Sequence, residues 1–394
     1  MKIAYFTDTF LPQVNGIATA LANQAAQLGK QGHSVLIFTP KLDGIPREKF
    51  KAENVQVIHL PTVPALLYPE FKLGVFGLPK VIKYLAKFDP DIIHLHSPLT
   101  VGMDAVTAAK IFKKPLVGTI HVYLTDSSYL RWLKYRLAVK VVDKVVERYL
   151  NFLFSQCDLV LAPSKMLVKE LTQTGFKKTV HYLPNGVILS QYKSLSLQDQ
   201  KSIKKKYGLK DKIVLHFGRL SPEKNVDLLI KSFSLLAKKH PDVSLLIIGD
   251  GPAKKSLVKL TKRLKLDNQV VFTGFIDHQK LISSGILTLG NLFATASTME
   301  NNPMAVLEAE MHGLPIVGVK QAGLVELISS NGFLAEAGDI KEMAEKMEKI
   351  LYNQTLADSM QKKSLEAIKP YAIDKVADTL LGFYHKLKLE TDQT

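Results

Sequence analysis

The feature that most restricts the fold of this chain is a regular alternation of short apolar runs and longer amphipathic segments. The runs occupy residues 2–8, 34–40, 55–60, 91–97, 115–121, 158–164 and 179–185, and then 212–218, 243–251, 269–275, 291–297 and 315–320. They are largely continuous Val, Ile, Leu and Phe, which is typical of parallel strands covered by helices on both faces. The two series therefore predict two doubly wound α/β domains.

The chain length agrees with this prediction, because 394 residues exceed one ordinary hydrophobic core. A polar stretch rich in Ser, Lys and Gln begins just after Pro-Asn-Gly at 184–186. We therefore expect one domain over 1–185, a second over 186–366 and a C-terminal segment over 367–394, which has helical spacing. Without a long Gly/Ser linker, the domains are expected to face a central cleft.

Charge and cysteine content narrow the class of protein. Lys and Arg total 52 and Asp and Glu total 36, and the resulting net charge of +16 attracts phosphate-rich partners. Nucleic acid is disfavoured, because the lysines are dispersed and there is no Cys/His finger or RNP-like motif. The single cysteine, Cys157, indicates a reducing cytoplasmic setting. Neither the N-terminus nor the uncharged segment 281–299 resembles a signal peptide or a membrane span.

The expected sheets also rank the candidate sites, because ligands bind beyond the carboxyl ends of parallel strands. The acidic pair Asp89 and Asp91 precedes its strand and is therefore predicted to be a turn. His94 and His96 share one face of that strand, and without a third nearby ligand we predict no metal site. His121 follows its strand, and it either faces a ligand or packs in the core.

Two glutamates, Glu300 and Glu308, lie on either side of Pro303, which suits the first position of a helix. Asn301 or Asn302 could cap that helix. Carboxylates only accept hydrogen bonds, so both glutamates suit the hydroxyls of a sugar or a ribose. The alternative is that Glu300 favours the helix dipole and Glu308 is a solvated surface residue.

Glycine turns and two cations complete the candidate site. Arg219 and Lys224 stand five positions apart beside the expected helix start at Ser221, which suits a diphosphate, although they could also be solvated cations on a surface turn. Such cations can stabilise a diphosphate leaving group without a metal. Gly16, in the first strand-to-helix loop, would admit a ligand to a helix N-terminus, and the absence of G-x-G-x-x-G disfavours a redox dinucleotide. Turns at 249–251 and near Gly274 could border a base.

Taken together, the segments PQVNG, TIH, APSK…LPNGV, FGRLSPEKN, IGDGP, VVFTGF and ENNPMAVLE resemble the family 4 glycosyltransferases, and the resemblance spans nearly the whole chain. These are retaining enzymes of the GT-B fold, with two Rossmann-like domains. The resemblance implies a nucleotide-sugar donor held mainly by the second domain, an acceptor-binding first domain and a C-terminal helix returning to the first domain. It also implies no cofactor and no dedicated metal, with the departing phosphate guiding the acceptor hydroxyl.

The same resemblance implies roles for particular residues. Arg219 and Lys224 would hold the diphosphate, Glu308 the ribose and Glu300 the sugar hydroxyls, while His121 would contact the transferred sugar. The remaining donor contacts would come from Gly16, Gly274, Ile276, Asn301, Asn302, Pro303 and Met304. A Gly-Gly pair usual in the family is reduced here to Gln321-Ala322-Gly323.

Two further segments, HSPLTVGMDAV at 96–106 and TIHVYLTDSSYL at 119–130, look like the membrane-associated branch that glycosylates diacylglycerol. In 119–130 the candidate acceptor residues are Asp126 and Tyr129. Residues 62–87 mix Leu, Phe and Tyr with Lys72, Lys80, Lys83 and Lys87. This composition suits an anionic bilayer, where each basic residue contributes about 1 kcal/mol.

A second amphipathic segment lies around 136–153. Its apolar side would carry Val142, Val145, Val146, Tyr149 and Leu153. We expect this side to pack on the first sheet, because every helix of such a domain must bury one face.

The sequence thus predicts transfer of glucose from UDP-glucose to 1,2-diacylglycerol, by a protein peripheral on the inner face of the cell membrane. GDP-mannose or UDP-galactose as donor, a glycolipid or polyprenyl acceptor, and the oligomeric state remain open. A glycoside hydrolase would need Glu300 and Glu308 to flank one glycosidic bond, and it leaves Arg219 and Lys224 unexplained. A nucleotide-sugar-binding subunit without activity is the non-enzymatic alternative.

Overall fold

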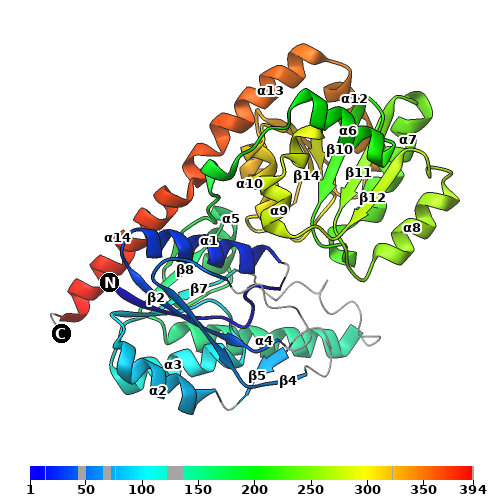
Figure 1. Cartoon of the computed structure of the whole chain (residues 1–394). Helices are drawn as coiled ribbons and strands as arrows, with labels where there is room; N and C mark the ends of the chain where they lie inside the picture. Colours follow the sequence, from blue (N-terminus) through cyan, green and yellow to red (C-terminus); the bar gives the residue numbers. More distant parts are fainter. Residues whose placement is uncertain are drawn as a thin grey trace. The chain divides into compact units, whose positions relative to one another are not determined.

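The computed structural model of the chain describes residues 1–13, 15–42, 50–64, 72–75, 77–121, 136–321 and 323–392. The chain divides into two compact units, Met1–Gly186 with Ile373–Thr394, and Val187–Ala372 (Figure 1). Each unit contains one parallel sheet with helices between its strands, so the prediction of two Rossmann-like domains is confirmed. The first unit ends at Gly186 rather than 185, and the chain re-enters it at Ile373 rather than 367.

The first unit is built on a seven-stranded sheet in the order β3-β2-β1-β6-β7-β8-β9. Its strands are β1 (Lys2–Phe6), β2 (Ser34–Pro40), β3 (Val55–Leu60), β6 (Ile92–Leu95), β7 (Leu116–Thr119), β8 (Leu159–Ala162) and β9 (Val180–Tyr182). Its helices are α1 (Gly16–Lys30), α2 (Leu78–Phe88), α3 (Thr100–Phe112), α4 (Arg136–Ser155), α5 (Lys165–Gln173) and α14 (Ile373–Asp392). All seven expected strands are present, and β4 (Thr62–Pro64) and β5 (Lys72–Gly74) form an additional antiparallel pair.

Each face of this sheet carries its own hydrophobic core. One core includes residues of α2, α3, α4 and α5, and the other includes residues of α1 and α14. Helix α14 runs beside α1 (Figure 1) and contributes Leu380 and Tyr384, both fully buried. A Cβ on Gly186 would lie 2.6 Å from Cδ1 of Ile373, so this close approach requires glycine.

The second unit is built on a six-stranded sheet in the order β12-β11-β10-β13-β14-β15. Its strands are β10 (Lys212–Phe217), β11 (Val243–Ile248), β12 (Val270–Gly274), β13 (Leu292–Ala294), β14 (Ile316–Val319) and β15 (Gly332–Ala335). Five of them match expected runs. The sixth, β15, was not predicted, because it is only four residues long and starts at a glycine.

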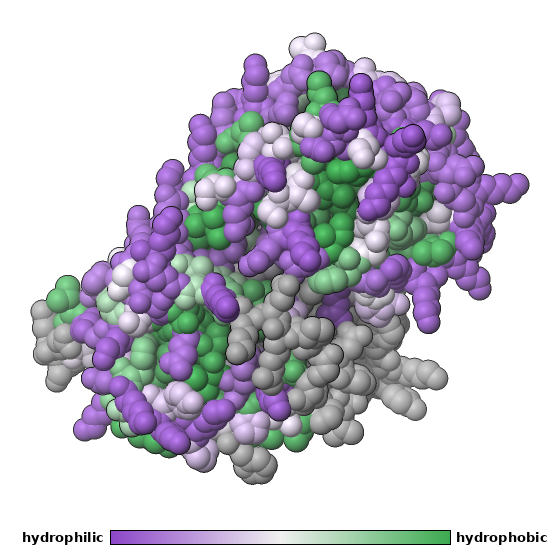
Figure 2. Space-filling view, viewed as in Figure 1, coloured by the Kyte–Doolittle hydropathy of each residue, from purple (hydrophilic) through white to green (hydrophobic). Residues whose placement is uncertain are grey.

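The helical elements of the second unit follow or cover these strands. They are η1 (Leu189–Gln191), α6 (Leu197–Tyr207), η2 (Pro222–Lys224), α7 (Val226–Lys239), α8 (Lys254–Arg263), α9 (His278–Ser283), η3 (Ile286–Leu289), α10 (Met304–Met311), α11 (Leu324–Leu327), α12 (Ile340–Leu351), α13 (Gln354–Ala367) and η4 (Lys369–Tyr371). Hydrophilic side chains dominate the visible surface of this unit (Figure 2). Among the described helices, none is long and apolar enough to cross a bilayer.

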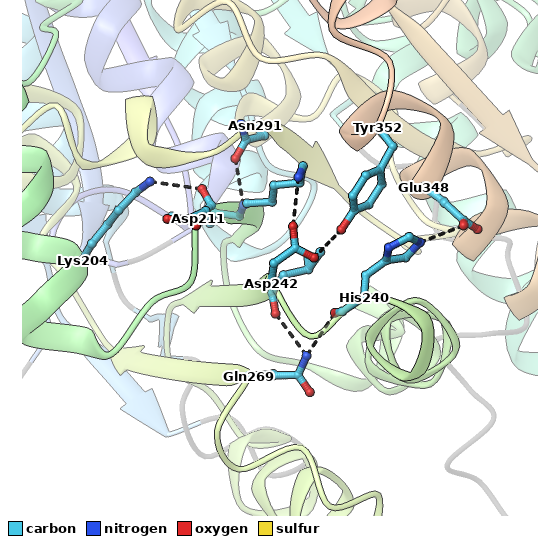
Figure 3. Close-up of polar contacts among 11 residues, drawn as sticks. Lys204, Asp211, His240, Asp242, Gln269, Asn291, Glu348 and Tyr352 are labelled. Carbon is cyan, nitrogen blue, oxygen red and sulfur yellow. Dashed lines mark hydrogen bonds and ion pairs between the residues drawn. The ribbon is translucent and has the colours of Figure 1, made fainter.

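Bonded polar side chains occupy the amino edge of the second sheet (Figure 3). Asp242 accepts from Nζ of Lys212 at 2.9 Å and from the hydroxyl of Tyr352 at 2.6 Å. Nε2 of His240 lies 2.8 Å from Oε1 of Glu348 on α12. These bonds tie the loops before the strands to α12 and its end, so we interpret this edge as structural.

The amino edge of the first sheet is also structural. Asp89 ends α2 in the left-handed conformation, with φ 47°. Asp91 accepts from the backbone N–H of Lys2 at 2.7 Å and pairs with Lys388 of α14. The prediction that these two aspartates form a turn is therefore confirmed.

Candidate active site

The candidate donor site lies where the strand order of the second sheet reverses. From β10 the chain proceeds to β11 and β12 on one side, whereas β13, β14 and β15 lie on the other. Ligands of doubly wound sheets bind at such a switch point. Here Nζ of Lys224, after β10, lies 2.5 Å from Oε1 of Glu300, after β13. Two residues 76 positions apart are thus brought together by the fold.

The backbone around Lys224 explains its position. The sequence predicted an α-helix opening at Ser221, but the segment is the short η2 turn, and α7 begins only at Val226. The helix is interrupted because Asn225 is left-handed, with φ 50°. The Asn225 amide donates to the carbonyl of Ala296 and to Oγ1 of Thr298, both at 3.2 Å. These bonds attach the η2 turn to the loop that carries Glu300.

The Gly-Asp-Gly turn after β11 packs directly on the turn after β10. A Cβ on Gly249 would lie 2.0 Å from the carbonyl oxygen of Gly218, and one on Gly251 would lie 2.4 Å from that of Leu220. The carbonyl of Asp250 also accepts from the Leu220 N–H at 2.9 Å. The glycines therefore allow close backbone packing that supports the turn holding Arg219, itself half-buried.

Lys254 is an additional cation at this edge that the sequence analysis missed. Its Nζ lies 2.6 Å from Oδ2 of Asp250, and a Cβ on Gly274 would be 3.4 Å from the same Nζ. The hydrogen bond from Lys254 lowers the pKa of Asp250. The spacing GDGPAK could have indicated this residue, because it places a lysine at the start of the helix after the turn.

Helix α10 begins one residue later than expected. Pro303 is its N-cap, with its carbonyl accepting from the Val306 N–H at 3.1 Å, so neither Asn301 nor Asn302 occupies the N-cap position. Asn302, Pro303 and Met304 are all buried at the point where α10 begins. The φ of Pro303, −70°, is compatible with a helix, but its ψ of 119° is extended, so the regular helix begins only at Met304.

Glu308 is buried, with only 5% of the residue exposed, so the interpretation of it as a solvated surface residue is wrong. Its Oε1 lies 2.6 Å from Nε2 of His278. Glu300 is held differently, because its backbone carbonyl accepts from the Gly323 N–H at 2.6 Å. A Cβ on Gly323 would lie 1.6 Å from the Asn301 oxygen, which explains why the reduced family motif keeps this glycine.

The switch point of the first sheet lies between β1 and β6. Gly16 is exposed at the first position of α1, which is capped by the Asn15 side chain accepting from the Ala18 N–H at 2.9 Å. Asp8 also lies here, fully enclosed, and accepts from Oγ1 of Thr100 at 3.3 Å. Burial raises the pKa of Asp8 to about 7. The sequence analysis assigned no role to Asp8, although it directly follows the first strand.

Three histidines cluster at the same edge. Nδ1 of His96 lies 3.3 Å from Nε2 of His121. Both nitrogens of His94 are bonded, one to the Tyr384 hydroxyl at 2.5 Å and one to Oγ1 of Thr119 at 2.7 Å. Burial lowers the pKa of His94 and His96, and that of His121 to about 4. His94 is therefore a packed, neutral histidine rather than a metal ligand.

His121 and His96 line a small hollow at this edge. Its other lining residues are Ala20, Leu21, Gln24, Thr119, Leu183, Pro184, Asn185 and Gly186. All of them belong to the first unit. The Pro-Asn-Gly segment, which the sequence analysis used as a boundary, is thus also a wall of this hollow.

The candidate acceptor and membrane residues have mixed outcomes. Asp126 and Tyr129 lie outside the described residues, and Lys72 lies in β5. Lys80 donates to the carbonyl of His59 at 2.7 Å, whereas Lys83 and Lys87 are exposed on α2.

The prediction for α4 is partly wrong. Tyr149 and Leu153 pack on the sheet as expected, but Val145 is 61% exposed. Phe152, about two helical turns further along α4, is 58% exposed. Arg148, which lies between Val145 and Phe152, is also exposed. Helix α4 therefore also exposes two apolar side chains, Val145 and Phe152, on a face that Arg148 interrupts.

Comparison with known families accounts for both units. The family model "Glycosyltransferase Family 4" matches residues 14–191, and "Glycosyl transferases group 1" matches residues 199–367. The fold and the paired motifs define a glycosyltransferase of the GT-B class. The chain belongs to the family 4 glycosyltransferases.

Curated relatives include enzymes with different donors. The chain is 28% identical to the alpha-monoglucosyldiacylglycerol synthase of Streptococcus pneumoniae, over 84% of this chain and 74% of the relative. It is 25% identical to the enzyme of the same name from Acholeplasma laidlawii, over 98% and 96%. It is also 27% identical to a GDP-mannose-dependent alpha-mannosyltransferase of Corynebacterium glutamicum, over 98% and 88%.

Solved structures share the fold over almost the whole chain. Sucrose-phosphate synthase from Thermosynechococcus elongatus has a TM-score of 0.80 at 20% identity, covering 98% of both chains. HepE from Anabaena in complex with UDP-glucose has a TM-score of 0.76 at 21% identity, covering 98% of this chain and all of that one. These similarities establish the architecture.

Proposed function

We propose that this glycosyltransferase moves glucose from UDP-glucose to 1,2-diacylglycerol with retention of the anomeric configuration. The observation that carries the proposal is the pair of Lys224 and Glu300 at the switch point of the second sheet. A cation and a carboxylate 2.5 Å apart offer complementary partners, one for phosphate oxygens and one for sugar hydroxyls.

The surrounding residues suit a nucleoside diphosphate. Arg219 and Lys224 would bind the diphosphate, and the backbone at Asn301 to Met304 would face it at the start of α10. Glu308 would accept from the ribose hydroxyls, while Gly274 and Ile276 would border the base. In the first unit, Gly16 would contact the phosphates and His121 the transferred sugar.

Cations take the place of a metal in this proposal. Positive charge stabilises a diphosphate leaving group directly, so the reaction needs neither a general acid for that group nor a bound metal. The departing phosphate would then guide the acceptor hydroxyl. Activity that is unchanged by a metal chelator would support this part of the proposal.

The proposed acceptor rests on relatives and on surface chemistry. Two similar curated enzymes are named for monoglucosyldiacylglycerol synthesis. In this chain, Lys83 and Lys87 are exposed on α2, and Val145 and Phe152 are exposed on α4. Basic and apolar side chains suit the surface of an anionic bilayer, where the protein would bind peripherally on its cytoplasmic side.

The test uses purified protein, vesicles containing diacylglycerol and phosphatidylglycerol, and labelled UDP-glucose, UDP-galactose or GDP-mannose. We expect a labelled α-glucolipid from UDP-glucose alone. A product from another donor would contradict the donor assignment, and no lipid product with any donor would contradict the acceptor assignment.

Two alternatives are separated by the same assay. Hydrolysis of a plain disaccharide without nucleotide would favour a hydrolase, which leaves the Lys224–Glu300 pair unexplained. Donor binding without turnover on any acceptor would favour a non-catalytic subunit.

A further inference from the structure

His278 is a residue at the donor site to which the proposed function assigns no role. It begins α9, directly after the β12 loop that contains Gly274 and Ile276. Its Nε2 lies 2.6 Å from Oε1 of Glu308, which belongs to α10. The His278 side chain is 29% exposed and that of Glu308 only 6% exposed. The contact therefore joins a loop expected to border the base to the carboxylate expected to bind the ribose.

The position of the imidazole is determined by local structure. Asp277 caps α9, with its Oδ1 accepting from the backbone N–H groups of Gln279 at 3.0 Å and Lys280 at 3.2 Å. These bonds hold the backbone on either side of His278. Leu281 and Ile282 of the same helix are buried, which anchors α9 in the second unit.

The charges around the imidazole favour an ion pair. Burial disfavours the charged form of His278, but attraction and a hydrogen bond to Glu308, with a further contribution from Asp277, outweigh it and raise the pKa of His278. His312 is the other titratable group near Glu308. Burial lowers the pKa of His312, and its Nδ1 donates to the Glu308 backbone carbonyl at 2.7 Å. Because Nδ1 of His312 is bonded to the backbone carbonyl, this nitrogen does not hold the Glu308 carboxylate.

We propose that His278 is a positioning residue, which holds Glu308 in place for recognition of a nucleoside diphosphate. This inference rests on the proposed function. His278 holds Oε1 of Glu308 and thereby orients Oε2 to accept hydrogen bonds from ribose hydroxyls. A buried carboxylate is costly without a charged or hydrogen-bonding partner, so the contact with His278 keeps the Glu308 side chain in one position. His278 thus acts on the nucleotide through Glu308, without contact to the reacting atoms.

The experiment measures UDP and GDP dissociation constants by calorimetry between pH 5.5 and 8.5, for the full-length wild type and for His278→Leu and His278→Gln. For His278→Leu we expect at least about tenfold weaker binding than wild type at pH 5.5, where His278 is charged. The difference should shrink as the pH rises, because the wild-type imidazolium loses its proton and its ion pair with Glu308 weakens. His278→Gln retains an N–H donor, so its affinity should stay near wild type. In turnover, His278→Leu should raise the donor KM more than it lowers kcat.

A matched control exists at the opposite edge of the same sheet. His240 and Glu348 form a similar pair at 2.8 Å (Figure 3), and His240 lies before β11 rather than after it, where the donor motifs lie. His240→Leu should leave the nucleotide affinity and its pH dependence unchanged. Thermal unfolding of all variants checks that each is folded.

The outcomes separate the two proposals. If Glu308→Gln weakens UDP binding but His278→Leu binds as wild type does, or is weakened equally at every pH, the role of His278 is wrong. If Glu308→Gln itself leaves the binding of both nucleotides unchanged, the ribose assignment in the proposed function fails. A pH-dependent loss of nucleotide affinity in His278→Leu, together with affinity near wild type in His278→Gln, supports the inference.

Discussion

At the scale of single residues, the donor site consists of charged side chains arranged in pairs. Lys224 pairs with Glu300, Lys254 with Asp250, and His278 with Glu308. Paired charges are held in defined positions, so a donor would exchange partners rather than order mobile side chains.

The first prediction concerns the Lys224–Glu300 pair. Lys224→Met removes the cation that would stabilise the leaving diphosphate, and we expect kcat to fall about 10²- to 10³-fold. Lys231→Met is the control, because Lys231 forms an exposed pair with Asp227 within α7. Initial rates with labelled donor measure both. An unchanged kcat in Lys224→Met would remove this residue from the proposed mechanism.

The second prediction concerns Glu310, which is fully buried on α10. Its Oε1 accepts from the Asn331 amide at 2.8 Å, and among the described residues its Oε2 has no hydrogen-bond partner. Burial raises the pKa of Glu310 from 4.5 to about 8. The folded state therefore binds the proton more tightly, so stability is retained below pH 4.5 and lost as the pH rises towards 8.

Glu310→Gln keeps the shape and removes the titration. We expect the Tm of Glu310→Gln to exceed that of the wild type by a difference that grows with pH and is on the order of 5 °C at pH 8. Scanning calorimetry from pH 5 to 8.5 measures this, with Glu366→Gln, an exposed glutamate paired with Lys363, as control. Parallel curves for wild type and Glu310→Gln would contradict the prediction.

At the scale of elements, glycines determine how loops and helices meet. Gly323 brings the start of α11 against the Asn301 carbonyl, and Gly249 and Gly251 bring the β11 turn against the β10 turn. The sequence analysis identified these turns, because glycine clusters after apolar runs are strong local signals. It could not predict which backbone each glycine approaches, because the partner lies tens of residues away.

The third prediction compares two glycines. Gly323→Ala places a methyl 1.6 Å from the Asn301 oxygen, so the loop that holds Glu300 must move. We expect a loss of about 1–3 kcal/mol in stability and weaker donor binding. Gly382→Ala, within α14, meets no atom within 4 Å and should stabilise by up to about 1 kcal/mol. Urea unfolding and UDP calorimetry measure both effects, and equal behaviour of the two variants would refute this account.

At the scale of the whole molecule, the chain forms two Rossmann-like units, and its C-terminal helix completes the first. The hydroxyl of Tyr384 on α14 bonds to His94 in β6, and Gln31 at the end of α1 donates to Asp378 at 2.7 Å. Sequence periodicity predicted the helix, and the family resemblance predicted its return. Its burial in the first core is a tertiary result, since 290 positions separate His94 from Tyr384.

The fourth prediction concerns membrane association. Phe152→Ser removes an exposed aromatic side chain from α4, and burying such a group is worth about 1.5–3 kcal/mol. We expect binding to phosphatidylglycerol vesicles to fall about tenfold, with further loss in high salt as the lysines are screened. Leu197→Ser, 78% exposed on α6, is the control. Co-sedimentation measures the binding of both variants. Equal binding by Phe152→Ser and wild type would exclude Phe152 from the membrane contact.

The sequence by itself determined the fold class, twelve of the strands, the boundary region after Gly186 and the motifs at the carboxyl edges, because period, glycine turns and charge are local properties. Tertiary structure alone decided that Lys224 meets Glu300, that His278 holds the buried Glu308, that β15 extends the second sheet and that Val145 faces solvent. Each of these depends on which distant segments pack together, and no local pattern contains that information.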